Sequence, residues 1–175
     1  KGFPYFIKAA RQVLDAGNDV EFLIAGTGPE ERRLRALARQ LDLTDHLTFI
    51  TNLPDFRSAI RAMDIFCLPS LMQGLGTVML EAMSLGRPVI ATGVGGIMSI
   101  IRDDETGLVI PAADSNSLAE RLLELLVDPI RARAIGSAAR QQVIESFDAR
   151  RMVELTADEY RSAISCTADT PTAAS

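Results

Sequence analysis

The sequence is poor in the residues from which disulfide frameworks and metal sites are built. Among 175 residues it has two cysteines, Cys67 and Cys166, and one histidine, His46. One cysteine lies in an apolar run and the other near the end of the chain, which indicates free thiols and a reducing compartment. No set of histidines, cysteines or carboxylates has the spacing of metal ligands, so we expect no metal site.

Long apolar runs and an excess of basic charge are also absent. No run approaches the roughly 20 residues that a membrane-spanning helix needs. A net charge of −5 argues against a nucleic-acid partner, because such partners select basic surfaces. No signal peptide is visible, and the chain begins with Lys1 rather than methionine. We therefore expect an excised or processed piece of a cytoplasmic protein.

The composition and periodicity are those of a globular α/β domain. A hydrophobic share of 47% and a charged share of 23% are ordinary for such a domain, and the length suffices for one sizeable core. Helical patterns alternate with short runs that are apolar throughout, which is typical of parallel strands buried on both faces. We predict a Rossmann-like, doubly wound parallel sheet with helices on both faces.

The boundaries follow from turn residues and from the ends of the periodic segments. The expected strands are residues 20–26, 47–50, 65–70, 87–92 and 106–111. The expected turn-plus-helix segments are 26–41, 52–63 and 73–83, and the other helices are 3–14, 114–126, 130–147 and 148–165. We place the domain at residues 1–165 and expect residues 166–175 to form a disordered tail.

Ligands of such sheets bind beyond the carboxyl ends of the strands. The loops at that edge are residues 26–28, 51–55, 69–76 and 92–96. The stretch "QGLGTVMLEAM" begins in the third of these loops, residues 69–76. Gly74 and Gly76 have no Cβ, so a ligand can approach the backbone there. The N–H groups at the start of the following helix attract phosphate. A tight turn without a ligand explains the two glycines equally well.

Glu81 is the single charged residue between Gly74 and Gly86, in a helix that we expect to be mostly buried. A carboxylate in such a place needs a partner or an opening. A capping box with Thr77 requires the acid three residues on, and Glu81 is four on. A buried pair with an arginine stays open as an alternative. We favour a ligand role, in which the carboxylate accepts hydrogen bonds from ribose hydroxyls.

The stretch "PSLMQGLGTVMLEAMSLGRPVIATGVGG", followed by "DDETGLVIPAADSNSLAERLLELL", resembles the C-terminal half of retaining GT-B glycosyltransferases of family 4. The likeness extends from Lys1 to about Tyr160. It implies a domain that binds a UDP- or GDP-sugar donor and takes part in carbohydrate biosynthesis. The acceptor, which the sequence does not identify as glycan, lipid or small molecule, would bind mainly to an N-terminal domain absent from this chain. Membrane contact, if any, would come from that other half.

The resemblance also implies roles for individual residues. Lys1 matches the lysine that, with an upstream arginine, neutralises the leaving diphosphate, and Glu81 matches the glutamate that holds the ribose hydroxyls. Gln73 stands where a sugar-contacting glutamate is usual. The remaining donor-binding positions are Gly26 and Gly28 in the G-x-G-P turn, Leu53 and Asp55 near the base, and Gly74, Leu75, Gly76 and Thr77 facing the diphosphate and the sugar.

Three positions depart from the family pattern. Gln73 and Ser99 each replace a carboxylate near the expected sugar site, and Gly93 stands where an aspartate is frequent. These departures motivate an alternative, a nucleotide-sugar-binding module that has lost catalysis. A nucleotide-sugar epimerase with the same two-domain fold is a further alternative, against which the motif argues. We expect the domain alone to bind a nucleotide sugar weakly and to transfer nothing.

Overall fold

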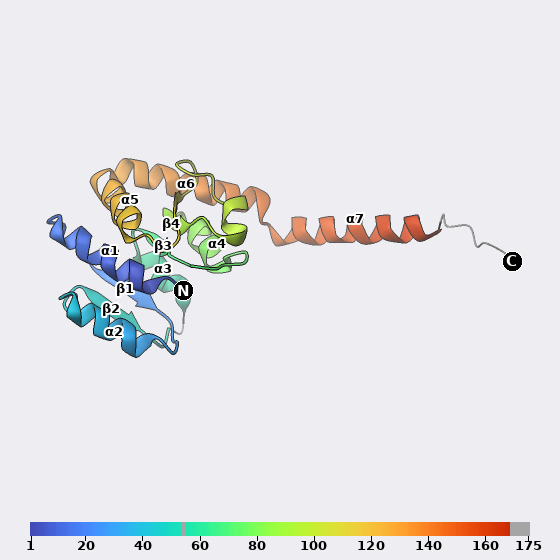
Figure 1. The fold of residues 1–175 in the computed structure, drawn as a ribbon. Helices are drawn as coiled ribbons and strands as arrows, with labels where there is room; N and C mark the ends of the chain where they lie inside the picture. The colour runs from blue at the N-terminus through green and yellow to red at the C-terminus, as the bar shows by residue number, and fades with distance from the viewer. Residues whose placement is uncertain (54, 169–175) are drawn as a thin grey trace.

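The computed structural model describes residues 1–53 and 55–168 (Figure 1). Its strands are β1 Phe22–Ala25, β2 Leu47–Ile50, β3 Phe66–Leu68, β4 Val89–Thr92 and β5 Leu108–Ile110. Its helices are α1 Phe3–Asp15, α2 Glu31–Gln40, α3 Phe56–Ala62, α4 Thr77–Ser84, the 3-10 helix η1 Gly95–Ser99, α5 Ser115–Val127, α6 Pro129–Ser146 and α7 Ala149–Ala168. Every strand and helix expected from the sequence is present.

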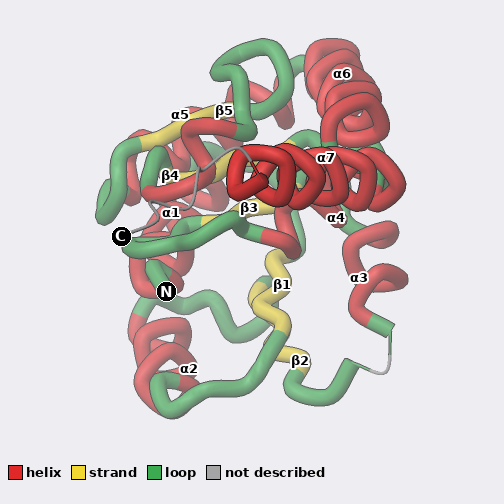
Figure 2. The backbone as a smooth tube through the Cα atoms, turned by 90° about the vertical axis from the view of Figure 1, so that its right-hand side faces the viewer, coloured by secondary structure: helices red, strands yellow, loops and turns green. Residues whose placement is uncertain are grey.

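The strands are parallel, but they form two ladders rather than one. β1 pairs with β2 in the register Phe22↔Leu47. β4 pairs with β3 on one side and with β5 on the other. Figures 1 and 2 both show the order β2, β1, β3 and β4 across the molecule. The parallel α/β class is therefore confirmed, whereas the separation of β1 from β3 differs from the expected continuous sheet.

Alternate residues of the strands enter two separate apolar cores. Ile90 of β4 joins the core that also holds α1, α2 and α5, whereas its neighbours Val89 and Ala91 join the core under α3 and α4. Successive strand side chains point to opposite faces, so these two cores lie on opposite faces of the β3–β5 ladder. Helices therefore cover both faces, as the continuous apolar runs predicted.

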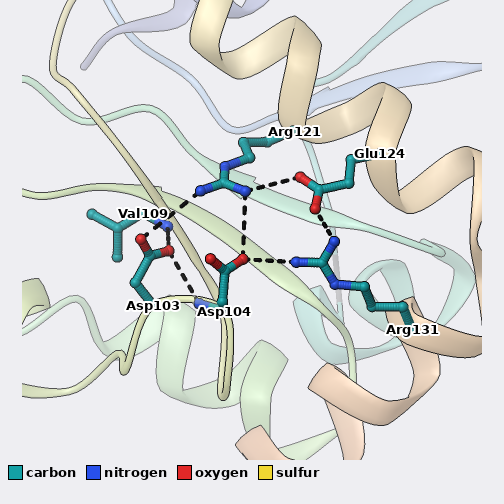
Figure 3. Close-up of polar contacts among 6 residues, drawn as sticks. All are labelled: Asp103, Asp104, Val109, Arg121, Glu124 and Arg131. Carbon is teal, nitrogen blue, oxygen red and sulfur yellow. Dashed lines mark hydrogen bonds and ion pairs between the residues drawn. The ribbon is translucent and has the colours of Figure 1, made fainter.

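An ion-pair network attaches the turn before β5 to two helices (Figure 3). Asp104 accepts from Arg121 of α5 and from Arg131 of α6, whose Nη2 lies 2.7 Å from the carboxylate. Glu124 binds the same two guanidinium groups. Asp103 accepts from the Val109 amide at 2.8 Å and so holds the start of β5. The two aspartates are about half exposed and the other three side chains are less exposed, and the network joins segments far apart in the sequence.

Helix α7 extends away from the rest of the fold (Figure 1). It reaches Ala168, three residues into the expected tail 166–175, and residues 169–175 lie outside the described part. Several of its apolar side chains are exposed, among them Met152, Leu155 and Tyr160. Within residues 1–53 and 55–168, no helix combines the length and the apolarity needed to cross a bilayer.

The N-cap of α5 leads to a testable pH dependence. The Asp114 carboxylate accepts from the Ser117 hydroxyl at 2.7 Å and from the amides of Ser117 and Asn116. The Ser117 hydroxyl, followed by its amide, lowers the pKa of Asp114 below the ordinary 3.8. Because the folded-state pKa is lowered, the cap stabilises the fold above the unfolded-state pKa. Its contribution is lost as the pH falls through the folded-state value.

We expect Asp114→Ala to lower Tm at pH 7, with a difference from the wild type that shrinks once the pH falls below about 4. Thermal unfolding followed by circular dichroism across this pH range measures both effects. Asp19→Ala, at an exposed aspartate outside the helices, is the matched control and should show no such trend. A Tm difference for Asp114→Ala that is the same at pH 3 and pH 7 would contradict this account of the cap.

Candidate functional site

The loop between β3 and α4 ends in an uncapped helix N-terminus. Gly76 is the N-cap residue of α4, has φ 71° in the left-handed region, and offers no side chain to the helix. Its carbonyl accepts from the amides of Met79 and Leu80. The preceding amides of Thr77 and Val78 belong to the first turn, whose N–H groups have no acceptor within the helix. They form a positive end suited to an anion.

Two glycine-containing loops come into backbone contact at this edge. A Cβ on Gly95, which has φ 56°, would lie 1.8 Å from the Gln73 carbonyl oxygen. A Cβ on Gly96 would lie 2.9 Å from the Gly74 carbonyl oxygen. Gly74 differs, because a Cβ there would meet no atom within 4 Å. The glycines of the 92–96 loop therefore allow close packing, whereas Gly74 faces open space.

Lys1 and Gln73, 72 residues apart in the sequence, meet at this loop. Lys1 Nζ donates to Gln73 Oε1 at 3.3 Å, and the Ser70 hydroxyl donates to the same oxygen at 3.1 Å. The buried Thr92 hydroxyl in turn donates to the Ser70 carbonyl. One amide oxygen thus accepts from both Lys1 and Ser70, and the amide nitrogen is left as a donor.

Glu81 lies on the exposed face of α4, one turn beyond Thr77, which is exposed as well. The opposite side of the helix is buried through Met79, Ala82 and Met83. The structure gives Glu81 no ion pair with any described residue. The alternative of a buried pair with an arginine is therefore wrong, because α4 turns its charged position outward. The carboxylate is open to a ligand.

A cavity of about 1390 Å³ runs beside the loop and contains only some of the expected site residues. Lys1, Gly26 and Gly28 line it, together with Ser70, Leu71 and Val78. The other expected residues of this loop and helix do not line it, namely Gln73, Gly74, Leu75, Gly76, Thr77 and Glu81. Lys1 belongs to both places, since it lines the cavity and binds Gln73.

Leu53 and Asp55 also lie outside the cavity lining. The Asp55 carboxylate caps α3, accepting from the Arg57 amide at 3.0 Å and from the Ser58 hydroxyl. The Ser58 bond is the main reason that the pKa of Asp55 is lowered. Asp55 therefore has a structural task that does not require a ligand. Leu53 is half-buried just before α3.

The remaining departures from the family pattern have local explanations. The Ser99 hydroxyl donates to the Gly96 carbonyl at 2.7 Å and closes the 3-10 turn η1. At Gly93, a Cβ would lie 2.9 Å from Met98 Sδ and 3.0 Å from a Val109 methyl. A side chain at position 93 would therefore displace Met98, which is itself exposed.

Sequence reasoning missed Ser70 and Thr92, which are polar and almost fully buried at 1% and 2% exposure. Each stands at the carboxyl end of a strand, and together they connect the ends of β3 and β4 to Gln73. Burying a hydroxyl is unfavourable unless it is hydrogen-bonded, and both of these are. The sequence did contain one sign of them, because each is a polar residue at the carboxyl end of an apolar run. The Cys67 residue, within β3, is partly buried against the core, and desolvation of its thiol raises the pKa to about 12.

Comparison with known proteins places this geometry in a family. Residues 1–142 match the family described as glycosyl transferases group 1. A GDP-mannose-dependent monoacylated alpha-(1-6)-phosphatidylinositol monomannoside mannosyltransferase from Corynebacterium glutamicum is 40% identical over 152 residues. The match covers 82% of this chain and 39% of that protein, so the chain spans about two fifths of the relative's length.

Two solved structures agree with this family. Sucrose-phosphate synthase from Thermosynechococcus elongatus has a TM-score of 0.85 and 30% identity, covering 95% of this chain and 43% of that one. The C-terminal domain of a glycosyl transferase group 1 family protein from Francisella tularensis has a TM-score of 0.78 and 29% identity, covering 85% and 80%. The chain belongs to the group 1 glycosyltransferases and corresponds to a C-terminal domain of that GT-B family.

Proposed function

We propose that this chain is the donor-binding domain of a retaining, family 4 glycosyltransferase, which transfers a sugar from a nucleoside-diphosphate sugar to an acceptor. The uncapped start of α4 beside the open space at Gly74 carries the proposal. A diphosphate fits there because the amides of Thr77 and Val78 and the Lys1 ammonium, which contacts Gln73, supply positive charge beside the same loop. The dependence of the corynebacterial relative on GDP-mannose supports a nucleotide-sugar donor.

The transfer step requires stabilisation of the leaving diphosphate. As the bond from the sugar to the phosphate breaks, negative charge grows on the phosphate oxygens and positive charge on the sugar ring. Preorganised donors aimed at such charge are each worth about 2.7–4 kcal/mol in other enzymes. In our proposal Lys1 and the first amides of α4 meet the phosphates, Glu81 accepts from the ribose hydroxyls, and the Gln73 amide nitrogen donates to the sugar.

The other donor-side contacts belong to the same proposal. Gly26 and Gly28 border the cleft from β1, Leu53 and Asp55 flank the base, and Leu75 lies against the sugar. The acceptor would bind mainly to the protein's own N-terminal domain. We expect the longer protein to act in the cytoplasm, and any membrane contact to come from the part outside this chain.

Calorimetry tests whether the domain binds a donor. We expect the folded chain Lys1–Ser175 to bind UDP, GDP or one of their sugar conjugates weakly, because the contacts of the N-terminal domain are missing from this sample. We expect this chain to show no transfer, and the longer protein to show it. Absence of binding heat for every nucleoside diphosphate, with the chain shown to be folded by circular dichroism, would contradict the proposal.

The second candidate function is a binding module without catalysis, which the amide at Gln73 motivates. Gln73 keeps the contacts with Lys1 and Ser70, so we expect the native longer protein to turn over a donor. A donor panel assayed with the native protein and with Gln73→Glu separates the two candidates. Turnover by the Glu form alone would favour the binding module. The relatives described above are transferases, so an epimerase is not favoured.

A further inference from the structure

The side-chain amide of Gln73 is held in one orientation by the two groups that bind its oxygen. Lys1 Nζ lies 3.3 Å from Gln73 Oε1, and the hydroxyl of the buried Ser70 lies 3.1 Å from the same atom. An ammonium group can only donate, so the amide oxygen and not the nitrogen faces Lys1. Both lone pairs of this oxygen are thereby used. Gln73 Nε2 has no acceptor among residues 1–53 and 55–168, so the side chain offers a ligand a donor and no acceptor.

The backbone next to Gln73 also presents donors rather than acceptors. A Cβ on Gly95 would lie 1.8 Å from the oxygen and 3.0 Å from the carbon of the Gln73 carbonyl, so this carbonyl points toward Gly95. The Gly74 carbonyl points toward Gly96 in the same way, at 2.9 and 3.4 Å. In a trans peptide the N–H points opposite to the C=O, so the amides of Gly74 and Leu75 point away from these two glycines. Neither amide donates to a residue in the described part of the chain.

Negative charge is absent from the three segments that meet at this loop. Residues 1–14, 65–80 and 87–102 contain no aspartate or glutamate, and the first of them brings the Lys1 ammonium. Glu81 comes next on the exposed face of α4, and in the proposed function it holds the ribose. The acidic residues at the start of α2 are each paired with an arginine, Glu30 with Arg33 and Glu31 with Arg35. The surroundings of Gln73 are therefore positive and rich in hydrogen-bond donors.

The chemistry of these groups favours a sugar substituent that accepts hydrogen bonds and carries negative charge. A hydroxyl of a neutral sugar donates as well as accepts, and at Gln73 its hydrogen would find no acceptor. A carboxylate only accepts, and its hydrogen bonds are stronger because it is charged. A glutamate at position 73 would repel such a carboxylate, whereas the neutral amide does not. Gln73 therefore suits an anionic sugar better than a neutral one.

We propose that the sugar transferred from the donor carries a carboxylate, as a uronic acid does, and that Gln73 Nε2 donates to this carboxylate. The inference rests on the proposed function, because it concerns the donor bound at the same loop. Lys1 and the first amides of α4 remain with the diphosphate, and the carboxylate is unchanged by the transfer. Gln73 is thereby a specificity-determining residue, and the amide at this position matches the charge of the substrate.

Matched pairs of donors test this preference in the longer protein. UDP-glucuronic acid and UDP-glucose differ only at C6 of the sugar, where the first has a carboxylate and the second a hydroxymethyl group. UDP-galacturonic acid with UDP-galactose, and GDP-mannuronic acid with GDP-mannose, are pairs of the same kind. Calorimetry gives the affinity for each conjugate. In at least one pair we expect the uronic acid conjugate to bind about 10- to 100-fold more tightly, which is the range for hydrogen bonds to a charged group.

Two substitutions at position 73 test whether this residue causes the preference. Gln73→Glu should weaken binding of the uronic acid conjugate at least about 100-fold, because a donor is lost and a repelling charge is added. Its affinity for the neutral conjugate should change less than about tenfold. Gln73→Met removes the donor without adding charge and should bring the two affinities together. Gln40→Glu, at an exposed glutamine that ends α2, makes the same charge change elsewhere and should behave as the wild type.

The possible failures of this inference and of the proposed function can be told apart. If the protein binds a nucleoside diphosphate but prefers the uronic acid conjugate in none of the pairs, the inference is overturned and the proposed function stands. A preference that survives in Gln73→Met, or in Gln73→Glu where that variant folds, would overturn the role of Gln73. If the folded protein binds no nucleoside diphosphate, the proposed function fails and the anionic sugar fails with it.

Discussion

Replacing Glu81 with alanine is expected to weaken nucleoside-diphosphate binding by the longer protein about 10- to 100-fold while leaving Tm unchanged. Hydrogen bonds to a charged acceptor contribute about 1.5–3 kcal/mol, and the ribose offers two hydroxyls to this carboxylate. The stability of the fold should not change, because the Glu81 side chain is exposed and has no ion pair within the described chain. Calorimetry gives the affinity and thermal unfolding gives Tm.

A ligand without the ribose hydroxyls makes this test specific. If Glu81 holds the ribose, the wild type should lose affinity for a 2′,3′-dideoxynucleoside diphosphate, and Glu81→Ala should bind both ligands alike. This is a double-mutant cycle between the carboxylate and the hydroxyls. Glu120→Ala, at an exposed glutamate of α5, is the matched control and should behave as the wild type. Equal ribose discrimination by wild type and Glu81→Ala would remove Glu81 from the donor site.

The arrangement of Glu81 illustrates what the sequence could predict. Apolar residues on most of α4 indicated a packed helix, and a single carboxylate indicated an opening or a partner. The sequence could not decide between these, because the outcome depends on which face of α4 meets the core. In the structure Met79 and Met83 are buried and Glu81 points outward. Local periodicity therefore predicted the helix, and tertiary packing decided the environment of its charge.

Contacts between distant segments were the part that local patterns could not reveal. Asp103 and Asp104 lie in a short acidic turn with no local sign of a partner, yet Asp104 binds two arginines from α5 and α6. The family resemblance implied that Lys1 and Gln73 face the same donor, but it did not indicate the hydrogen bond between them. The division into two ladders had no signal at all, because β1 and β3 each have the apolar pattern of a buried strand. A pattern that indicates burial does not tell which strand supplies the neighbour.

Gly95→Ala is expected to destabilise the fold by about 2–5 kcal/mol, because it combines two separate penalties. A left-handed backbone costs a residue with a Cβ about 1–2 kcal/mol, and Gly95 has φ 56°. Overpacking typically costs about 1–3 kcal/mol, and the new Cβ would lie 1.8 Å from the Gln73 carbonyl oxygen. At this chain length the loss corresponds to a fall in Tm of about 4–20 °C, which thermal unfolding measures directly.

Gly74→Ala is the matched variant, and it separates packing from ligand binding in the same pair of loops. A Cβ at Gly74 meets no atom within 4 Å, so Tm should stay close to that of the wild type. In our proposal the diphosphate occupies that open space, so the same methyl group should block it and weaken nucleoside-diphosphate binding at least about tenfold. A Gly74→Ala protein with wild-type affinity would mean that the phosphates do not approach this backbone. The open space would then need another explanation, and the first amides of α4 would lose their assigned ligand.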